Sequence, residues 1–388
     1  MDNKENNNTP NFYGFSLPNI GAPKFMETNN KQWISYGQDN NYPRYLIDLL
    51  NSSSKHSAIV KRKTDLSVGG GFINKNEFID NPNGSEDLND IVYKSGYDLN
   101  LYGAFSLIIT WSKDRKSIAR VQYVDTSKVR IAKEFPEGTV EYNRQLEGVD
   151  FYYISEDWTN TRKDKNKPLL VQGFSDKFND EPTQLVYTKE YRPGNEYYTL
   201  PDYIASIDWI SLDSEIVNFH LNSVHNGFTP SMIINFNQGV PTTEEQQRIY
   251  KQVQSKYSGT DNASKVFITF SEGGDSKPDF LPINLNDSDE RFLMLETHIQ
   301  QNILTGHRIP PIIAGVQTEG KLGSSDEVRE QEMLFQSQVI SSKQKLIERT
   351  YNKLAKLNGL TEDIKLLVVS TFPIEDNTVV VPQNDLNE

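Results

Sequence analysis

The clearest hydrophobic periodicity in the chain lies between residues 201 and 227. Apolar side chains recur there at spacings of three, four and seven, at Tyr203, Ile207, Ile210, Val217, Leu221 and Val224. This spacing predicts a helix with one apolar face. Pro201 suits the first turn, because its missing N–H needs no partner there, and Asn226-Gly227 favours a stop. Such a helix would be about 40 Å long.

A second periodic segment covers residues 287–306, with Phe292, Leu295, Ile299 and Ile303 on one face. The proline pair Pro310-Pro311 cannot continue this helix, and the glycines between 315 and 323 predict a flexible loop. Ser324 and Glu327 then form a capping-box pattern. We expect a third long helix to begin there and to end at Asn358-Gly359.

Residues 229–283, between the first two helices, carry a pattern of their own. A strand is predicted over 231–236, and Val266 to Phe270 predicts a second strand. Thr242 and Glu245 form a capping box for a helix that would reach Tyr257. The sequence therefore predicts a small αβ unit in this segment.

The N-terminal half predicts an α+β domain over residues 32–200, preceded by a polar, Asn-rich flexible arm over 1–31. Expected helices lie after Pro43, at about 54–68 and at 86–101. Expected strands lie at 105–111, 119–124, 129–132, 151–154 and 169–171. The half of this domain after residue 134 is expected to be rich in loops. Residues 361–388 form a short tail with one strand-like run at 366–369.

Composition changes this picture in one respect. Apolar residues make up 36% of the 388 residues and the mean hydropathy is −0.62, which predicts a thin core for each chain. Either part of the chain is disordered, or neighbouring subunits stabilise an elongated fold. The absence of cysteine excludes disulfides, thiolate metal sites and cysteine nucleophiles. We expect no secretory signal and no membrane span.

The sequence does not nominate a catalytic mechanism. No HExxH, phosphate-loop or nucleophile-elbow motif occurs, and we expect the five histidines to be structural or surface residues. Asp287, Asp289 and Glu290 stand at a predicted helix start, where acidic residues are common. We therefore expect no catalytic residue, no metal and no cofactor. A metal-dependent nucleic-acid-processing enzyme that uses these carboxylates is kept as an alternative.

The distribution of charge is more informative. The formal net charge is −13, and no Lys or Arg occurs from Pro193 to Gln247, a stretch with seven carboxylates. One interpretation is chance, with a partner surface that supplies the positive charge. The other is a helix facing a polyanion that it must let pass, because carboxylates repel phosphates. Under this interpretation the candidate residues are Asp202, Asp208, Asp213 and Glu215.

The order of elements after residue 200 resembles the portal proteins of tailed bacteriophages. The resemblance rests on Asn226-Gly227-Phe228-Thr229-Pro230 after the first long helix and on His307-Arg308-Ile309-Pro310-Pro311 after the second. Upstream, Tyr102-Gly103-Ala104-Phe105 is similar to the first domain of that family. The resemblance covers roughly residues 32–360.

The resemblance implies a portal-type α+β fold with a wing, two long stem helices, a small αβ clip, a tunnel loop and a long C-terminal helix. The implied parts are a wing at 32–200, stem helices at 201–228 and 284–310, a clip at 229–283, a tunnel loop at 311–324, a wing or crown helix at 325–360 and a short crown at 361–388. Within the tunnel loop, Gln317, Thr318, Glu319 and Lys321 are the residues expected to approach DNA.

The function implied by the resemblance is a dodecameric ring at one capsid vertex, through which DNA is packaged and ejected. The implied partners are other copies of the chain, the major capsid protein, the terminase large subunit, the head–tail adaptor and double-stranded DNA. No cofactor and no membrane are implied. The protein would assemble in the bacterial cytoplasm and reside in the virion. Another structural capsid or adaptor protein is the second alternative.

Overall fold

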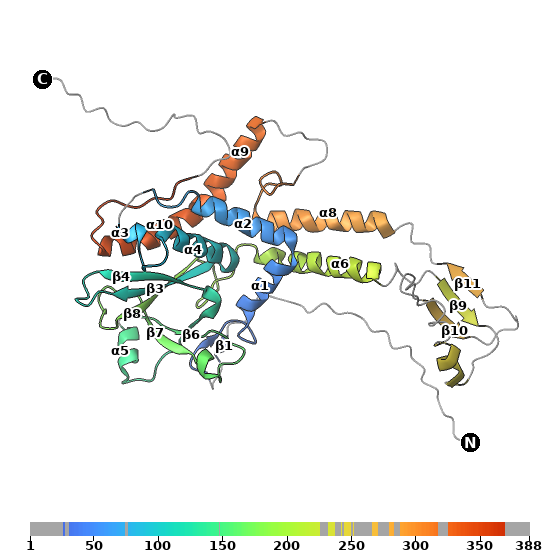
Figure 1. The fold of residues 1–388 in the computed structure, drawn as a ribbon, viewed down its shortest axis with the longest axis horizontal. Coiled ribbons are helices and arrows are strands. Elements are labelled where there is room, and N and C mark those ends of the chain that lie inside the picture. Colours follow the sequence, from blue (N-terminus) through green and yellow to red (C-terminus); the bar gives the residue numbers. More distant parts are fainter. Residues whose placement is uncertain are drawn as a thin grey trace, which may run out of the picture.

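The computed structural model describes residues 26–27, 31–73, 77–146, 148–225, 232–236, 242, 244–249, 251, 266–270, 279–282, 288–316 and 325–368. Figure 1 shows a body of helices and sheet from which two helices, α6 (Ile207–His225) and α8 (Ser288–His307), extend side by side toward a small separate sheet. The fold is therefore mixed helix and sheet, as predicted.

A six-stranded sheet forms one side of the body, in the order β4-β3-β8-β7-β6-β5. Neighbouring strands are antiparallel except β7 and β8, which are parallel. The bounds are β3 Ala104–Trp111, β4 Ile118–Val124, β5 Val129–Ile131, β6 Phe151–Ile154, β7 Leu169–Gly173 and β8 Thr183–Lys189. Strand β8 was missed by the sequence analysis, because polar residues flank its short apolar run.

Helices α2 (Ser54–Val68), α4 (Leu88–Tyr102) and α10 (Ser341–Leu357) pack with β3 and β4 around one core. This core includes Leu99, Leu107 and Ile347, all fully buried. Helix α2 ends as predicted at glycines, and Gly69 and Gly71 have positive φ. Smaller elements complete the body, namely α1 Tyr42–Ser52, α3 Glu77–Asp80, α5 Val140–Leu146, β1 Met26–Glu27 and β2 Ile34–Ser35.

Helix α6 begins later than the sequence predicted. Pro201 precedes the helix, and a 3-10 turn over Ile204–Ser206 leads into α6 at Ile207. The helix begins late because two residues of the segment before it contact the body. The hydroxyl of Tyr203 donates to the carbonyl of Leu101 at 2.7 Å, and Asp202 faces buried cations. Further along, α6 packs against α8.

The end of α8 lies close to the 3-10 turn at Gly306. A Cβ at this position would lie 1.8 Å from Oγ of Ser206, which itself donates to the carbonyl of Asn302 at 2.9 Å. A side chain at 306 would push α8 away from the 3-10 turn at Ile204–Ser206, so only glycine fits at this position.

The small sheet has the order β10-β9-β11. Strands β9 (Met232–Phe236) and β10 (Val266–Phe270) are parallel, and β11 (Asp279–Pro282), which the sequence analysis missed, is antiparallel to β9. Parallel neighbours require a crossover connection. The part of the crossover that the structure describes is helical at 244–249 and 251. Glu245 accepts from both N and Oγ1 of Thr242, at 3.3 and 3.2 Å, in keeping with the capping-box pattern.

The predicted long C-terminal helix is divided. Helix α9 (Ser325–Phe335) is followed by a π-helical stretch, Gln336–Ile340, and then by α10. Inserted π-helical turns bend helices, and α9 projects away from the body in Figure 1. The expected strand at 366–369 is reduced, within the described part, to one isolated bridge between Leu366 and Phe72.

Candidate functional site

The inner half of the two long helices is anchored in the body. Ile207 and Ile210 of α6 and Ile299 and Ile303 of α8 are at most 4% exposed and belong to one core with α1 and α2. We call this region, residues 199–213 and 299–311, the stem root. The apolar periodicity that predicted both helices is therefore explained here by burial.

The outer half of the same helices is different. Val217 and Leu221 of α6 are 49% and 52% exposed, and Leu293 and Met294 of α8 are 65% and 59% exposed. The periodic apolar face continues along α6, but the body no longer covers it. Val217 and Leu221, one helical turn apart, leave an exposed apolar stripe on α6 that a partner can cover.

At the stem root, Asp202 sits in a mostly buried cluster of cations. Its Oδ2 lies 2.6 Å from Nζ of Lys63, 3.4 Å from Nη2 of Arg308 and 3.6 Å from Nζ of Lys343. The Asp202 side chain is 11% exposed, and Lys63 and Lys343 are almost completely buried. Nζ of Lys343 also contacts Glu190 at 3.0 Å. The cluster links the segment that precedes α6 to α2, α10 and the end of α8.

Electrostatics in this cluster favour the charged form of Asp202. Burial alone would raise its pKa, but the positive charges of Lys343 and Lys63 hold the pKa of Asp202 far below its usual value. Burial lowers the pKa of Lys63 to about 8 despite the contact with Asp202. Burial has the same effect on Lys343, but its two carboxylate partners, Asp202 and Glu190, outweigh it and the pKa of Lys343 is raised.

Asp213 is buried as well. It accepts from Oγ of Ser53 at 2.7 Å and pairs with Nζ of Lys55 at 2.5 Å. Ser53 also caps α2, because its Oγ accepts from the backbone N of His56 at 3.2 Å. Asp213 therefore fastens the middle of α6 to the N-terminus of α2.

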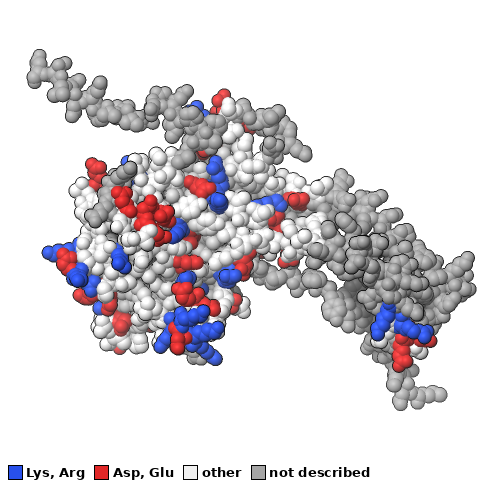
Figure 2. All heavy atoms as spheres, in the orientation of Figure 1, with Lys and Arg blue, Asp and Glu red and all other residues white. Residues whose placement is uncertain are grey.

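These contacts correct half of the acidic face proposed from the sequence. Asp208 and Glu215 are exposed on α6, but Asp202 and Asp213 are not, because cations from α2, α8 and α10 pair with them. The stretch from Pro193 to Gln247 contains no Lys or Arg, and the cations that pair with its buried carboxylates come from distant parts of the chain. On the face shown in Figure 2, charges of both signs are scattered over the body in small groups.

The expected tunnel-loop residues Gln317, Thr318, Glu319 and Lys321 lie outside the described residues. The structure describes the approach to them. Arg308 has a φ of 56°. A turn follows at residues 310–313, in which the carbonyl of Pro310 accepts from the backbone N of Ile313 at 3.0 Å. Ile309 and Ile313 are buried in the stem-root core, so the start of this segment is anchored.

Two of the five histidines meet beside the Asp202 cluster. Nδ1 of His56 lies 3.0 Å from Nε2 of His307, and both rings pack against Tyr203. Burial, reinforced by the charge of Lys63, lowers the pKa of His56 to about 3 and the pKa of His307 well below its usual value. Both are therefore neutral, structural histidines, which agrees with the expectation from the sequence.

The alternative of a metal-dependent enzyme uses Asp287, Asp289 and Glu290, whose side chains are not among those that the structure describes. Within the ranges that the structure describes, no three His, Asp or Glu side chains are placed to hold a metal ion. Asp287 lies outside those ranges. Across the same ranges, no helix combines the length and the apolar character needed to span a bilayer.

Comparison with known proteins gives a consistent result. The family model described as "Phage portal protein" matches residues 75–366. A "Probable portal protein" of Haemophilus phage HP1 is 23% identical over 194 residues, which is 50% of this chain and 56% of the phage protein. An uncharacterised protein of Rickettsia bellii is 24% identical over 149 residues, 38% of this chain and 37% of that protein. The matches thus span about half or less of these relatives.

Solved structures share the fold. A chain from the virion of a native gene transfer agent particle superposes with a TM-score of 0.53 over 86% of this chain and 84% of that chain, at 14% identity. A chain from the neck of that particle, computed with C12 symmetry, gives 0.50 over 83% of both chains at 15% identity. An HK97 family phage portal protein from Corynebacterium diphtheriae gives 0.50 over 82% and 94%, at 9% identity.

Two long helices that leave a mixed body, a small sheet beyond them, and a family match over most of the length agree with one another. Portal proteins are structural proteins and not enzymes. The chain belongs to the phage portal protein family.

Proposed function

We propose that this protein forms a ring at one vertex of a tailed-phage capsid and that DNA passes through the ring during packaging and ejection. The observation that carries the proposal is the exposed apolar surface on the outer half of α6 and α8. In a single chain, Val217, Leu221, Leu293 and Met294 would face water. In a ring, each copy can cover the stem helices of the next by a repeated head-to-tail contact.

The same proposal assigns roles to the parts of the chain. Residues 32–200 form the wing against the major capsid protein, 201–228 and 284–310 form the stem, and 229–283 form the clip. The clip, at the far end of the stem, is the docking site for the terminase large subunit and later for the head–tail adaptor. Residues 325–360 run back across the ring, and 361–388 form a short crown.

Two groups of residues would face DNA. Asp208 and Glu215, exposed on α6, give the channel wall a negative charge that reduces adhesion of the duplex. The tunnel loop, 311–324, with Gln317, Thr318, Glu319 and Lys321, approaches the duplex. The neck of the native gene transfer agent particle, computed with C12 symmetry, supports a ring of about twelve copies.

Electron microscopy of the purified full-length chain tests the ring. We expect class averages with a central hole and about twelvefold symmetry. The variant Leu221→Asp/Leu293→Asp should remain monomeric, because it places charges in the proposed contact. Leu169→Asp, at a leucine that is 66% exposed on the body, is the matched control and should still form rings. A wild-type chain that stays monomeric, or rings in the double variant, would contradict the proposal.

A further inference from the structure

Five cations converge above the Asp202 cluster. Lys189, Arg192, Arg308, Lys345 and Arg349 line a cavity of about 550 Å³ at the stem root. We call these five residues the basic rim. They come from the end of β8, the segment after it, the end of α8, and α10. Among the residues that line this cavity, the carboxylates are Glu190 and Asp202.

Buried lysines already neutralise the two carboxylates. Asp202 pairs with the buried Lys63 and Lys343, and Glu190 pairs with Lys343. Two carboxylates thus face two buried lysines before the basic rim is counted. The five charges of the rim are therefore in excess, which is unusual in a chain whose formal net charge is −13.

Three members of the basic rim are held in place by the body. Nζ of Lys189 donates to the carbonyls of Glu196 and Tyr197, both at 2.5 Å. Nη1 of Arg192 donates to the carbonyl of Pro201 at 3.1 Å, and Arg308 reaches Asp202. Carbonyl partners orient a cation without cancelling its charge, so Arg192 keeps its attraction for an anion, whereas the carboxylates of Asp150 and Glu196 also act on Lys189.

The other two members, Lys345 and Arg349, are exposed on α10 and make no side-chain hydrogen bond or ion pair with the part of the chain that the structure describes. They are one helical turn apart, about 6 Å along the axis. Both are therefore available to a ligand, and a guanidinium can bind two oxygens of one phosphate.

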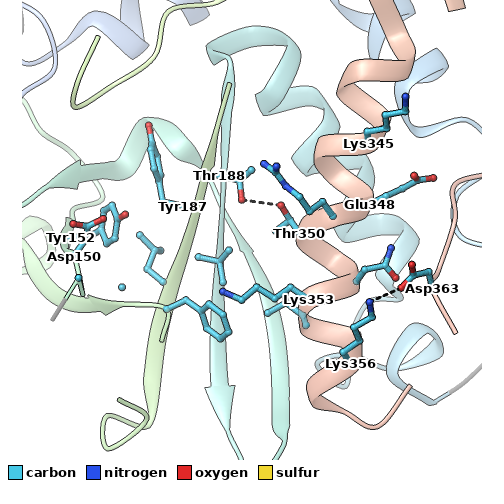
Figure 3. A pocket seen from close by; sticks show the side chains of 18 residues that line it. Asp150, Tyr152, Tyr187, Thr188, Lys345, Glu348, Thr350, Lys353, Lys356 and Asp363 are labelled. Atoms are coloured by element: carbon cyan, nitrogen blue, oxygen red, sulfur yellow. Dashed lines mark hydrogen bonds and ion pairs between the residues drawn. The ribbon is translucent and has the colours of Figure 1, made fainter. Parts of the chain in front are cut away.

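The same two residues also line a larger groove. It has a volume of about 770 Å³ and runs between α10 and strands β7 and β8 (Figure 3). Here Lys353 lies 4.5 Å from the centre of the Phe174 ring, and Lys356 pairs with Asp363 at 2.9 Å. Three carboxylates and four cations line this groove, whereas two carboxylates and five cations line the cavity at the basic rim, so the excess of positive charge is larger at the rim.

We propose that the basic rim binds phosphate groups of the double-stranded DNA backbone. The inference rests on the proposed function, which brings DNA to the ring. Lysine and arginine contacts to phosphates provide affinity without reading sequence, which suits a protein that must accept any packaged DNA. The basic rim would then hold DNA, and the exposed carboxylates Asp208 and Glu215 of α6 would repel it.

Fluorescence anisotropy with a labelled 30-bp duplex, titrated with the full-length protein over a range of sodium chloride, tests this proposal. The rim variant is Lys345→Glu/Arg349→Glu. The matched control is Lys113→Glu/Lys116→Glu, which changes the net charge equally at two exposed lysines between β3 and β4. We expect the rim variant to bind at least about tenfold more weakly and its log–log salt slope to fall by about 2, while the control changes little.

Four outcomes would overturn the proposal. They are no DNA binding by the wild type, equal affinity of wild type and rim variant, an equal loss in both double variants, and a loss of ring assembly with DNA binding unchanged. The last would identify the rim as a contact for an acidic surface of a second copy. Wild-type protein that forms no rings would refute the proposed function. The comparison of the rim variant with its control would still test whether the basic rim binds DNA.

Discussion

The inner and outer halves of the two long helices carry the same kind of sequence and have opposite environments. At the stem root, apolar side chains are buried and Asp202 and Asp213 pair with cations from elsewhere in the fold. Farther out, Val217, Leu221 and Leu293 are exposed. An amphipathic acidic helix is therefore not one kind of surface. The part of the molecule that lies against each turn decides whether its carboxylate anchors the helix or faces solvent.

The largest effect is expected from removing the charge of Asp202. Asp202→Asn leaves Lys63 and Lys343 buried with less compensation, and breaking a buried ion pair costs about 3–5 kcal/mol. Asp208→Asn, the same change at an exposed position of the same segment, should alter the free energy of unfolding by no more than about 0.5 kcal/mol. Urea denaturation of both variants measures the difference, and equal stabilities would break the comparison between buried and exposed carboxylates.

The second prediction concerns acid. His56 and His307 have folded-state pKa values below the unfolded value of about 6.5, so the unfolded chain binds more protons below that pH. Their contribution to stability is complete above about pH 6.5 and is lost as the pH falls from there toward 3. The loss is up to about 1.4 kcal/mol per pH unit for each histidine.

Denaturation curves between pH 7 and 5 measure this slope. His307→Gln should reduce it by about one proton, whereas His298→Gln, at an exposed histidine of the same helix, should leave it unchanged. A slope that responds equally to both substitutions would show that the buried pair is not its source.

The smallest change in stability is expected at the exposed carboxylates of α6. Asp208→Lys/Glu215→Lys should shift the free energy of unfolding by about 0.5 kcal/mol or less. It should nevertheless make assembled rings retain duplex DNA at low salt and release it at high salt, because the substitution adds phosphate contacts. Filter-binding of rings across a salt series measures retention. Retention that equals that of the wild type at every salt concentration would mean that this face does not line the channel.

Periodicity was sufficient to predict most helices. It identified α2, α4 and α8 nearly to the residue, because long apolar repeats and glycine stops are local signals. It missed β8, which owes its place in the sheet to pairing with β3 and β7. It also missed the π-helical stretch at Gln336–Ile340, since nothing in the local pattern announces it.

The candidate site was harder to predict than the fold. Asp202 pairs with Lys63, which is 139 positions away in the sequence, and Asp213 pairs with Lys55, which is 158 positions away. A charge count along one segment cannot include such partners. The same reason hid the basic rim, whose cations lie on separate segments that meet only after folding.

The position of Asp202 has a mechanical consequence. One carboxylate bonds to cations of α2, α10 and the end of α8, so tilting the helix pair against the body would pull opposite charges apart inside a medium of low dielectric constant. Such a separation costs several kcal/mol. The stem root is therefore rigid. A force applied to the small sheet of β9, β10 and β11 would be transmitted to α10 and would not bend the chain at residue 202.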